Sequence, residues 1–239
     1  MVSRCASIDE LEVLAPVPKP GRFVIVGLNY RSHVDEFSEA AGLTPSYEIE
    51  EPFIFECPGT AVCAPGGEIV LPSESTQVDY EGEVAVVIGR EADHVSEEGA
   101  WAHVAGVTAV NDVSARDLQT KAMFGEWQGT VGSAKGFPTF KPLGPALRTA
   151  DEIDSGFDLG ITTTVNGELR QNGRTSEFLT PIDRLISFIS QQMVLQPGDV
   201  ICTGSPRGVG MFLGGIWLRP GDLVEIEVEG VGALRNTVR

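Results

Sequence analysis

Two glutamates spaced two residues apart, Glu81 and Glu83, are the side chains of this sequence whose spacing most plainly allows chemistry. They lie in the run 78–89, which predicts one continuous strand that enters the core, and successive side chains of a strand point to opposite faces. Glu81 and Glu83 then share a face with Ala85 and Val87, so we expect them at the mouth of a buried region. Two neighbouring carboxylates are costly to bury unless a cation pairs with them. A divalent metal ion is such a cation, although an edge strand with charged residues fits the same pattern.

A third carboxylate, Asp112, ends a β-rich run that begins at Val104. If Asp112 faces the strand that carries Glu81 and Glu83, three carboxylates meet. Such an all-oxygen site suits Mg²⁺ or Mn²⁺ and leaves positions for water or substrate. With three histidines in the chain, a cage of imidazoles is not expected. Taken alone, Asp112 is equally a turn-forming residue.

His33 and Glu36 stand three residues apart, which places them on one side of a helical turn. In that arrangement a carboxylate orients an imidazole as a general base, although a surface helix with an incidental pair has the same spacing. Lys135 belongs to a glycine-rich stretch, where a lysine is usually solvated. The polar stretch 38–51 predicts a mobile loop or a lid.

The elements that position these residues are predicted to be mostly strands. The chain has 28 glycines, 15 prolines and only short apolar runs, which favours a β-rich fold with many turns. Asn166-Gly167 predicts a tight hairpin. Thr180-Pro181 predicts the start of a helix, with Thr180 as its N-cap. By contrast with Glu81 and Glu83, the glutamates of 223–229 fill one face of a strand completely, which is typical of a face in water.

Composition indicates a globular chain with 42% hydrophobic and 21% charged residues. The formal net charge of −17 makes nucleic acid and anionic membranes poor partners. A small anionic substrate then requires a metal ion and a few basic side chains to reverse the sign locally. No apolar run is long enough for a membrane span, and residues 1–20 lack a signal-peptide core. The four cysteines form no CxxC pair, so reduced thiols and a cytoplasmic location are expected.

Several motifs occur in a fixed order over residues 20–239, and they are Gly27-Leu-Asn-Tyr-x-x-His33-x-x-Glu36, Asp79-Tyr-Glu81-x-Glu83, Asn111-Asp112-x-x-Ala-Arg116-Asp117-x-Gln119, Ala134-Lys135-Gly-Phe and Thr203-Gly-x-Pro-x-Gly-Val-Gly210. In this ordered set the chain resembles the fumarylacetoacetate hydrolase family, in its C-terminal-domain form. The resemblance implies an α+β, predominantly β fold, a mixed β-sandwich roll with few short helices. It also implies a homodimer. Residues 1–20 would be an N-terminal arm and residues 21–239 the catalytic domain.

The resemblance also assigns roles. Glu81, Glu83 and Asp112 would bind Mg²⁺ or Mn²⁺. His33, Glu36 and Lys135 would be catalytic, with the histidine and glutamate activating water and the lysine beside the substrate oxygens. The residues expected to contact substrate are Arg116, Gln119, Thr203, Gly204 and Ser205.

Family substrates are 2-oxo or 2,4-dioxo acids. We therefore expect metal-dependent hydrolysis of a C–C bond in an acylpyruvate-like 2,4-dioxo acid through an enolate, which the metal and Lys135 would stabilise. One alternative is an isomerase or decarboxylase of 2-oxo or 2-hydroxy-dienoate intermediates of aromatic degradation. Another, of a different class, is a catalytically silent, metal-stabilised binding protein. Two positions depart from many relatives: Cys57 stands where they have lysine, and Pro138 where they have aspartate.

Overall fold

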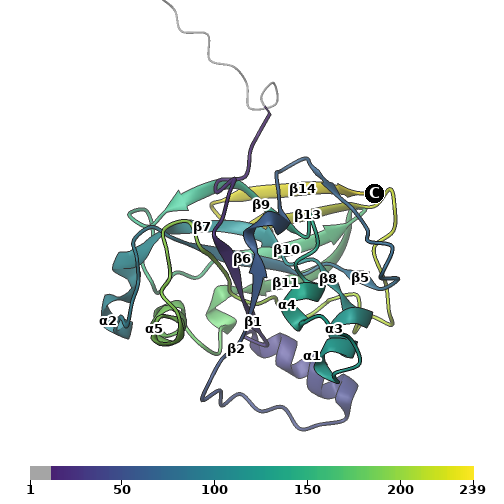
Figure 1. The fold of residues 1–239 in the computed structure, drawn as a ribbon, viewed down its shortest axis with the longest axis horizontal. Coiled ribbons are helices and arrows are strands. Elements are labelled where there is room, and N and C mark those ends of the chain that lie inside the picture. The colour runs from purple at the N-terminus through teal and green to yellow at the C-terminus, as the bar shows by residue number, and fades with distance from the viewer. Residues whose placement is uncertain (1–11) are drawn as a thin grey trace, which may run out of the picture.

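Strands dominate residues 12–239, the part of the chain that the computed structural model describes (Figure 1). The strands are β1 (Arg22–Gly27), β2 (Phe53–Pro58), β3 (Val62–Cys63), β4 (Glu68–Ile69), β5 (Val78–Asp79), β6 (Gly82–Ile88), β7 (Val104–Asn111), β8 (Ser114–Ala115), β9 (Lys141–Thr149), β10 (Gly160–Val165), β11 (Glu168–Arg174), β12 (Val200–Cys202), β13 (Leu223–Val228) and β14 (Gly232–Val238). The α-helices are α1 (Arg31–Ala41), α2 (Glu97–Ala100), α3 (Arg116–Met123), α4 (Val131–Ala134) and α5 (Ile182–Gln192). The α+β, predominantly β class is confirmed. Residues 1–11 of the predicted arm lie outside the described residues.

Two large sheets and a short strand pair make up the body. One sheet has the order β2-β1-β12-β6-β7-β9-β3, the other has the order β11-β10-β13-β14-β4, and β5 pairs with β8. Within the first sheet, β6 lies between β12 and β7 and is antiparallel to both. Strands β10 and β13 of the second sheet lie against β6 and β7. The main apolar core is therefore enclosed between the two sheets.

Strand β6 divides its side chains between two apolar clusters. Val84 and Val86 belong to the core between the sheets, whereas Ala85 and Val87 pack in a second cluster on the opposite face. This alternation is the one predicted from the sequence. The continuous strand predicted from Val78 is wrong, because β5 ends at Asp79 and β6 begins only at Gly82. Glu81 lies in this break, directly before the buried strand.

The glutamate-rich strand β13 behaves as predicted. Val224, Ile226 and Val228 are buried, while Glu227 is exposed and Glu225 is half-buried. Regular alternation with a solvated face is therefore present in β13 and absent from β6, where every residue is buried. This contrast supports reading Glu83 as a deliberately buried carboxylate.

Helix α1 is attached to the sheet through Asn29, just after β1. The Asn29 side chain donates to the Thr203 carbonyl at 2.9 Å, and its oxygen accepts from the Thr180 N–H at 2.8 Å. The helix ends at Ala41 because Gly42 adopts the left-handed region with φ +67°. The loop predicted for 38–51 is therefore wrong for residues 38–41, which are helical, and residues 43–50 have no regular structure.

Two local predictions have different outcomes. The hairpin at Asn166-Gly167 joins β10 to β11 with φ values of +53° and +79°, as predicted. The helix after Thr180 begins one residue later than predicted, at Ile182, and the buried Thr180 hydroxyl has no hydrogen-bond partner among the described residues, so it is not an N-cap. In Figure 1, α2 and α5 lie at one side of the sheets, and α1, α3 and α4 lie at the other.

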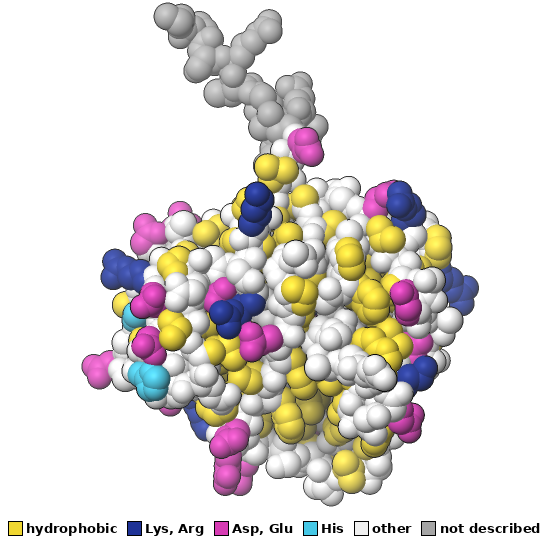
Figure 2. Space-filling model, in the orientation of Figure 1, with side chains coloured by type: hydrophobic (Ala, Val, Ile, Leu, Met, Phe, Trp, Pro, Cys, Tyr) yellow, Lys and Arg dark blue, Asp and Glu magenta, His cyan; other side chains and the backbone are white. Residues whose placement is uncertain are grey.

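The face of the molecule shown in Figure 2 carries acidic and basic side chains scattered among hydrophobic ones. Basic groups do not gather there into a continuous patch. Among the helices of residues 12–239, none combines the length and the apolar character needed to cross a membrane.

Candidate active site

Three buried carboxylates converge where β6 and β7 meet the short pair β5–β8. Glu81, Glu83 and Asp112 each offer one oxygen, and these three oxygens lie within 4.8 Å of one another. Asp112 directly follows β7, and its N–H donates to the Glu81 carbonyl at 2.8 Å, so both residues extend the pairing of the two strands. Three carboxylate oxygens at this spacing fit a hard divalent cation such as Mg²⁺ or Mn²⁺.

Lys135 lies between two of these carboxylates. Its ammonium bonds to Glu81 Oε2, to Asp112 Oδ2 at 2.5 Å and to the Ser114 hydroxyl at 2.7 Å. Burial alone would lower the pKa of Lys135, but Asp112 and Glu81 raise it above its usual value. Lys135 therefore remains a cation beside the carboxylates, rather than the solvated side chain that its glycine-rich surroundings suggest.

Arg116 lies on the other side of Glu81. Its Nη2 is 2.8 Å from Glu81 Oε1, its Nε is 2.9 Å from Asp79 Oδ2, and its Nη1 donates to Gln119 Oε1 at 3.0 Å. Burial opposes the ionisation of Glu81, but Arg116 and Lys135 outweigh it and hold the pKa of this carboxyl well below its usual range. Gln119 and Asp79 thus hold Arg116 against Glu81.

Glu83 differs from the other two carboxylates because no basic side chain within residues 12–239 forms an ion pair with it. Its described partner is the Gly204 N–H, which donates to Oε2 at 2.8 Å. Burial, together with Asp112 and Glu81, raises the pKa of Glu83 well above its usual range. A buried carboxylate of this kind is stabilised by a nearby divalent cation.

His33 and Glu36 form a second cluster on α1. The imidazole Nδ1 lies 2.8 Å from Glu36 Oε1, and the Gly208 N–H donates to Glu36 Oε2 at 2.8 Å. Both side chains are buried, and His33 is close enough to Glu81 to lower the pKa of that carboxyl. Because Nδ1 is bonded to Glu36, Nε2 is the nitrogen left to exchange a proton.

A cavity of about 470 Å³ opens beside Glu36. Two arginines, Arg170 and Arg207, line it, and the buried Nε atom of Arg170 has no hydrogen-bond partner among the described residues. The remaining lining residues are Glu39, Ala40, Asn172, Gly208, Phe212 and Leu213. The cavity therefore offers guanidinium groups next to the His33–Glu36 pair.

In the loop at 203–205, two of the three residues expected to contact substrate are already bonded to other groups of the protein. The Thr203 hydroxyl donates to the Val84 carbonyl at 2.7 Å, and the Gly204 N–H is bonded to Glu83. Gly204 has φ +95°, and a Cβ there would lie 3.0 Å from Asn29 Cβ, so the turn suits glycine. Ser205 is different, because its buried hydroxyl has no hydrogen-bond partner among the described residues.

Three residues of the carboxylate cluster were not singled out from the sequence. Ser114 accepts from Lys135 and lies 3.1 Å from Glu81 Oε2. Asp79 anchors Arg116, and the N–H groups of two residues of the glycine-rich loop donate to its carboxylate. Lys141 pairs with Asp112 at 2.7 Å. Asp79 and Ser114 lie inside motifs quoted from the sequence but had no assigned role in the site, whereas Lys141 gave no sequence signal.

The two departures noted in the sequence lie in different settings. Cys57 is buried on β2, where burial raises the pKa of its thiol and Lys141 partly opposes that shift. Pro138 is exposed in the turn before β9. The cysteine therefore belongs to the surroundings of the carboxylate cluster, and the proline changes only a surface turn.

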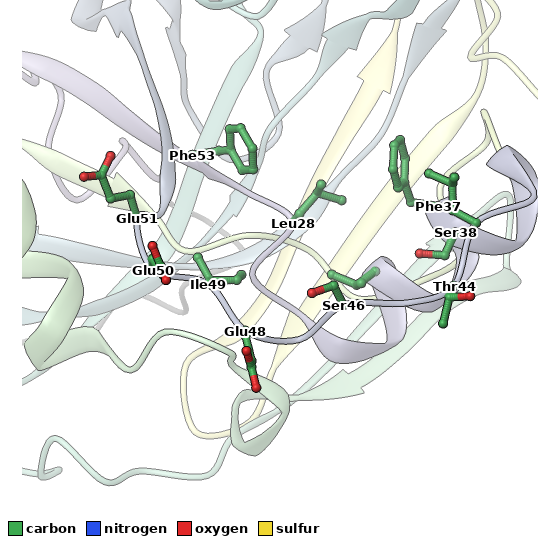
Figure 3. Close-up of a pocket in the computed structure, with 12 residues that line it drawn as sticks. Leu28, Phe37, Ser38, Thr44, Ser46, Glu48, Ile49, Glu50, Glu51 and Phe53 are labelled. Atoms are coloured by element: carbon green, nitrogen blue, oxygen red, sulfur yellow. The ribbon is translucent and has the colours of Figure 1, made fainter.

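A second cleft, of about 310 Å³, lies between α1 and the irregular segment that follows it. Figure 3 shows Phe37 and Phe53 on opposite sides of it with Leu28 between them. Glu48, Glu50 and Glu51 also line this cleft. None of the predicted site residues lines it, so the candidate chemistry lies elsewhere, around Glu81 and His33.

Comparisons with known proteins identify the family of this chain. The model of the fumarylacetoacetate (FAA) hydrolase C-terminal family matches residues 22–239. The chain is 41% identical over 231 residues to human "Oxaloacetate tautomerase FAHD2A, mitochondrial", covering 96% of this chain and 70% of that protein.

Solved structures of the same family are similar as well. One is 5-carboxymethyl-2-hydroxymuconate delta-isomerase from Mycobacterium smegmatis, with a TM-score of 0.82 and 40% identity over 99% of this chain and 85% of that chain. Another is 2-hydroxyhepta-2,4-diene-1,7-dioate isomerase from Mycobacterium marinum, with a TM-score of 0.80 and 38% identity over 100% of this chain and 81% of that chain. On its profile, fold and motifs, this chain belongs to the fumarylacetoacetate hydrolase family and is an enzyme.

Proposed function

We propose that this enzyme transfers a proton at the carbon next to the 2-oxo group of a small 2-oxo dicarboxylic acid, which is keto–enol tautomerisation or isomerisation. The observation that carries the proposal is the buried cluster of Glu81, Glu83 and Asp112 with Lys135 bonded to two of its members. Relatives are named as a tautomerase of oxaloacetate and as isomerases of 5-carboxymethyl-2-hydroxymuconate and 2-hydroxyhepta-2,4-diene-1,7-dioate, which are 2-oxo or 2-hydroxy acids with two or three carboxylates. Of the reactions implied by the family resemblance, we therefore favour the isomerase alternative over hydrolysis.

The carboxylates would hold a divalent cation, which is Mg²⁺ or Mn²⁺ in this proposal. When bound, such a cation polarises a carbonyl group and makes the neighbouring C–H more acidic. The buried ammonium of Lys135 would stabilise negative charge on the substrate oxygen through its own positive charge, because its three N–H groups are already bonded to Glu81, Asp112 and Ser114. Lys135 is suited to this because its raised pKa keeps it charged.

His33 is the group that moves the proton. Glu36 holds the imidazole through Nδ1, and the Gly208 N–H holds Glu36 in turn, so Nε2 accepts a proton from the substrate carbon and returns it to another position. The same side chain serves as base and acid, as a tautomerisation requires. Phe212 lies 5.9 Å from the imidazole, measured between ring centroids, and shields it from water.

A second carboxylate of the substrate would bind in the cavity beside Glu36. Arg170 and Arg207 line this cavity, and a guanidinium binds a carboxylate through paired hydrogen bonds. Ser205, with its free buried hydroxyl, is the member of the 203–205 loop best placed to contact substrate. Arg116 and Gln119 would act on substrate only indirectly, because Arg116 is bonded to Asp79 and Glu81 and Gln119 accepts from Arg116.

Hydrolysis of an acylpyruvate-like 2,4-dioxo acid is the second candidate. The His33–Glu36 pair favours it, since a histidine oriented by a carboxylate also activates water.

A homodimer and a cytoplasmic location are further parts of the proposal. Sedimentation would test the dimer, and fractionation of the source cells would test the location. The name of the human relative gives a mitochondrial location for that protein.

The experiment that tests the function is a substrate panel with product identification. Oxaloacetate, a 2-hydroxy-dienedioic acid and an acylpyruvate are each incubated with enzyme and Mn²⁺, and the products are followed by NMR. Tautomerised or isomerised products of unchanged mass support the proposal. Cleavage of the acylpyruvate alone, with no proton exchange on the other two acids, would establish hydrolysis instead.

A further inference from the structure

Lys141 is a second lysine of the carboxylate cluster, and the proposed chemistry does not use it. It is the first residue of β9 and is completely buried. Its ammonium forms an ion pair with Asp112 Oδ1 at 2.7 Å and donates to the carbonyls of Phe140 at 3.1 Å, Val113 at 3.5 Å and Lys135. A buried ammonium destabilises a fold unless it is paired and hydrogen-bonded, and the three carbonyls match its three N–H groups.

The contacts of Lys141 join two parts of the site. Each oxygen of Asp112 lies beside an ammonium, because Lys135 donates to Oδ2 and Lys141 forms an ion pair with Oδ1. The same Lys141 ammonium also holds the main chain of Lys135, at the C-terminal end of α4. One buried group thereby fixes both a carboxylate of the cluster and the backbone that carries the other ammonium.

Lys141 also completes a continuous series of ion pairs. Six buried side chains of alternating charge form this series, and each is paired with the next: Asp79, Arg116, Glu81, Lys135, Asp112 and Lys141. Glu83 stands outside this series, with the Gly204 N–H as its partner. Without Lys141, Asp112 would be the end of the series, and one of its buried oxygens would have no cation.

We propose that Lys141 is a positioning residue, which fixes Asp112 and the Lys135 main chain so that the carboxylate cluster binds a divalent cation with the correct geometry. The inference rests on the proposed metal site. Groups that hold metal ligands through hydrogen bonds typically contribute 10–100-fold to metal affinity or activity. Because Lys141 does not face the substrate, its effect is transmitted through Asp112 and Lys135.

The sign of the effect on metal affinity distinguishes positioning from simple charge. Removing a cation from beside three carboxylates makes their surroundings more negative, which by Coulomb attraction alone would tighten the binding of a divalent cation. Removing a positioning contact instead leaves Asp112 free to turn away, which weakens binding. The two explanations therefore predict changes of opposite direction.

The test measures Mn²⁺ affinity by calorimetry in the full-length wild-type enzyme and in Lys141→Met. We expect the dissociation constant of the variant to rise by about 10–100-fold. Lys121→Met is the matched control, because Lys121 is exposed on α3, and it should bind Mn²⁺ like the wild type. An unchanged or tighter affinity in a folded Lys141→Met protein would overturn the proposal.

Lys141→Gln keeps a hydrogen-bond donor and covers the case in which Lys141→Met does not fold. Its dissociation constant for Mn²⁺ should exceed that of the wild type, and equal affinity would again overturn the proposal. In either folded variant, kcat should fall more than KM rises, because Lys135 is misplaced while the substrate cavity is intact. Wild-type protein that binds no Mn²⁺ would reject the metal site as well, whereas wild-type-like binding in the variants would reject only the role of Lys141.

Discussion

The imidazole Nδ1 of His33 lies 2.8 Å from Glu36 Oε1, and the Gly208 N–H fixes the other oxygen of the same carboxylate at 2.8 Å. The pair therefore has a defined geometry before any substrate is present. A surface pair of the same type, His94 with Asp93 at 2.5 Å, has no such support, and its imidazole side chain is 70% exposed. This contrast supports the proposed role of His33, rather than His94, in proton transfer.

Replacing His33 by alanine should lower kcat for the best substrate by about 10²-fold or more, the usual scale for a general base. Affinity for Mn²⁺ should change little, because the carboxylate cluster is intact. Steady-state kinetics and calorimetry on the same preparation check both statements. His94→Ala is the control and should keep wild-type turnover; a His33→Ala enzyme with normal kcat would remove His33 from the mechanism.

Lys135→Met removes the buried ammonium but keeps most of its length. If Lys135 stabilises negative charge on the substrate oxygen, kcat should fall by about 10²–10³-fold, the scale for losing one preorganised donor. The loss should appear for proton exchange and for any hydrolysis alike, because both reactions place charge on that oxygen. A variant with normal kcat and a raised KM would show that Lys135 only anchors the substrate.

Arg170→Gln should discriminate between substrates. It removes a guanidinium from the cavity beside Glu36 while keeping hydrogen-bonding groups. KM should rise about tenfold for a 2-oxo dicarboxylic acid, which corresponds to a loss of about 1.4 kcal/mol. For a 2-oxo monocarboxylic acid such as pyruvate it should stay unchanged, and competition between the two acids provides the measurement. An equal effect on both acids would place the second carboxylate elsewhere.

Glu83→Gln should stabilise the protein in EDTA at pH 8 while abolishing Mn²⁺ binding. Burial and the neighbouring carboxylates raise the pKa of Glu83 in the folded state. The stability linked to its proton is then fully present below the unfolded value of about 4.3 and is lost as the pH rises through the folded-state pKa. Glutamine does not ionise, so the Glu83→Gln protein does not lose this stability as the pH rises.

The gain in melting temperature should therefore grow from near zero at pH 4 to a few degrees at pH 8, since about 1 kcal/mol corresponds to roughly 2–4 °C in a domain of this size. Thermal unfolding in EDTA across this range is the measurement. Glu227→Gln, on the exposed face of β13, is the control and should show no such trend. A Glu83→Gln protein less stable than wild type at pH 8 would contradict the claim that the buried, ionised Glu83 destabilises the metal-free protein.

Much of the fold and part of the site follow from local sequence patterns. The strand pattern predicted the β-rich class, the two faces of β6 and the solvated face of β13. These predictions hold because side-chain alternation is a local property of a strand. The proximity of Asp112 to Glu81 was expected only if their two strands were neighbours, and the pairing of β6 with β7 meets that condition.

Other features depend on contacts between residues that are far apart in the sequence. Lys141 reaches Asp112 because β9 pairs with β7, an order of strands that no local pattern encodes. Ser114-Ala-Arg-Asp117 has the sequence form of a capping box, yet Ser114 lies in β8, its hydroxyl donates to Glu81, and α3 begins at Arg116 without a side-chain cap. The break between β5 and β6 was also missed, because apolar alternation continues across it.

The central claim is that Glu81, Glu83 and Asp112 hold a divalent cation on which proton transfer depends. The most direct measurement follows the loss of the enol absorbance of oxaloacetate, or of another 2-oxo dicarboxylic acid that the panel identifies. It compares metal-stripped wild-type enzyme, the same enzyme with Mn²⁺, and Glu81→Ala and Asp112→Ala enzymes with Mn²⁺. The account predicts that only wild-type enzyme with Mn²⁺ makes the enol absorbance fall much faster than Mn²⁺ alone does. An equally fast fall with the metal-stripped enzyme or with either variant would contradict it.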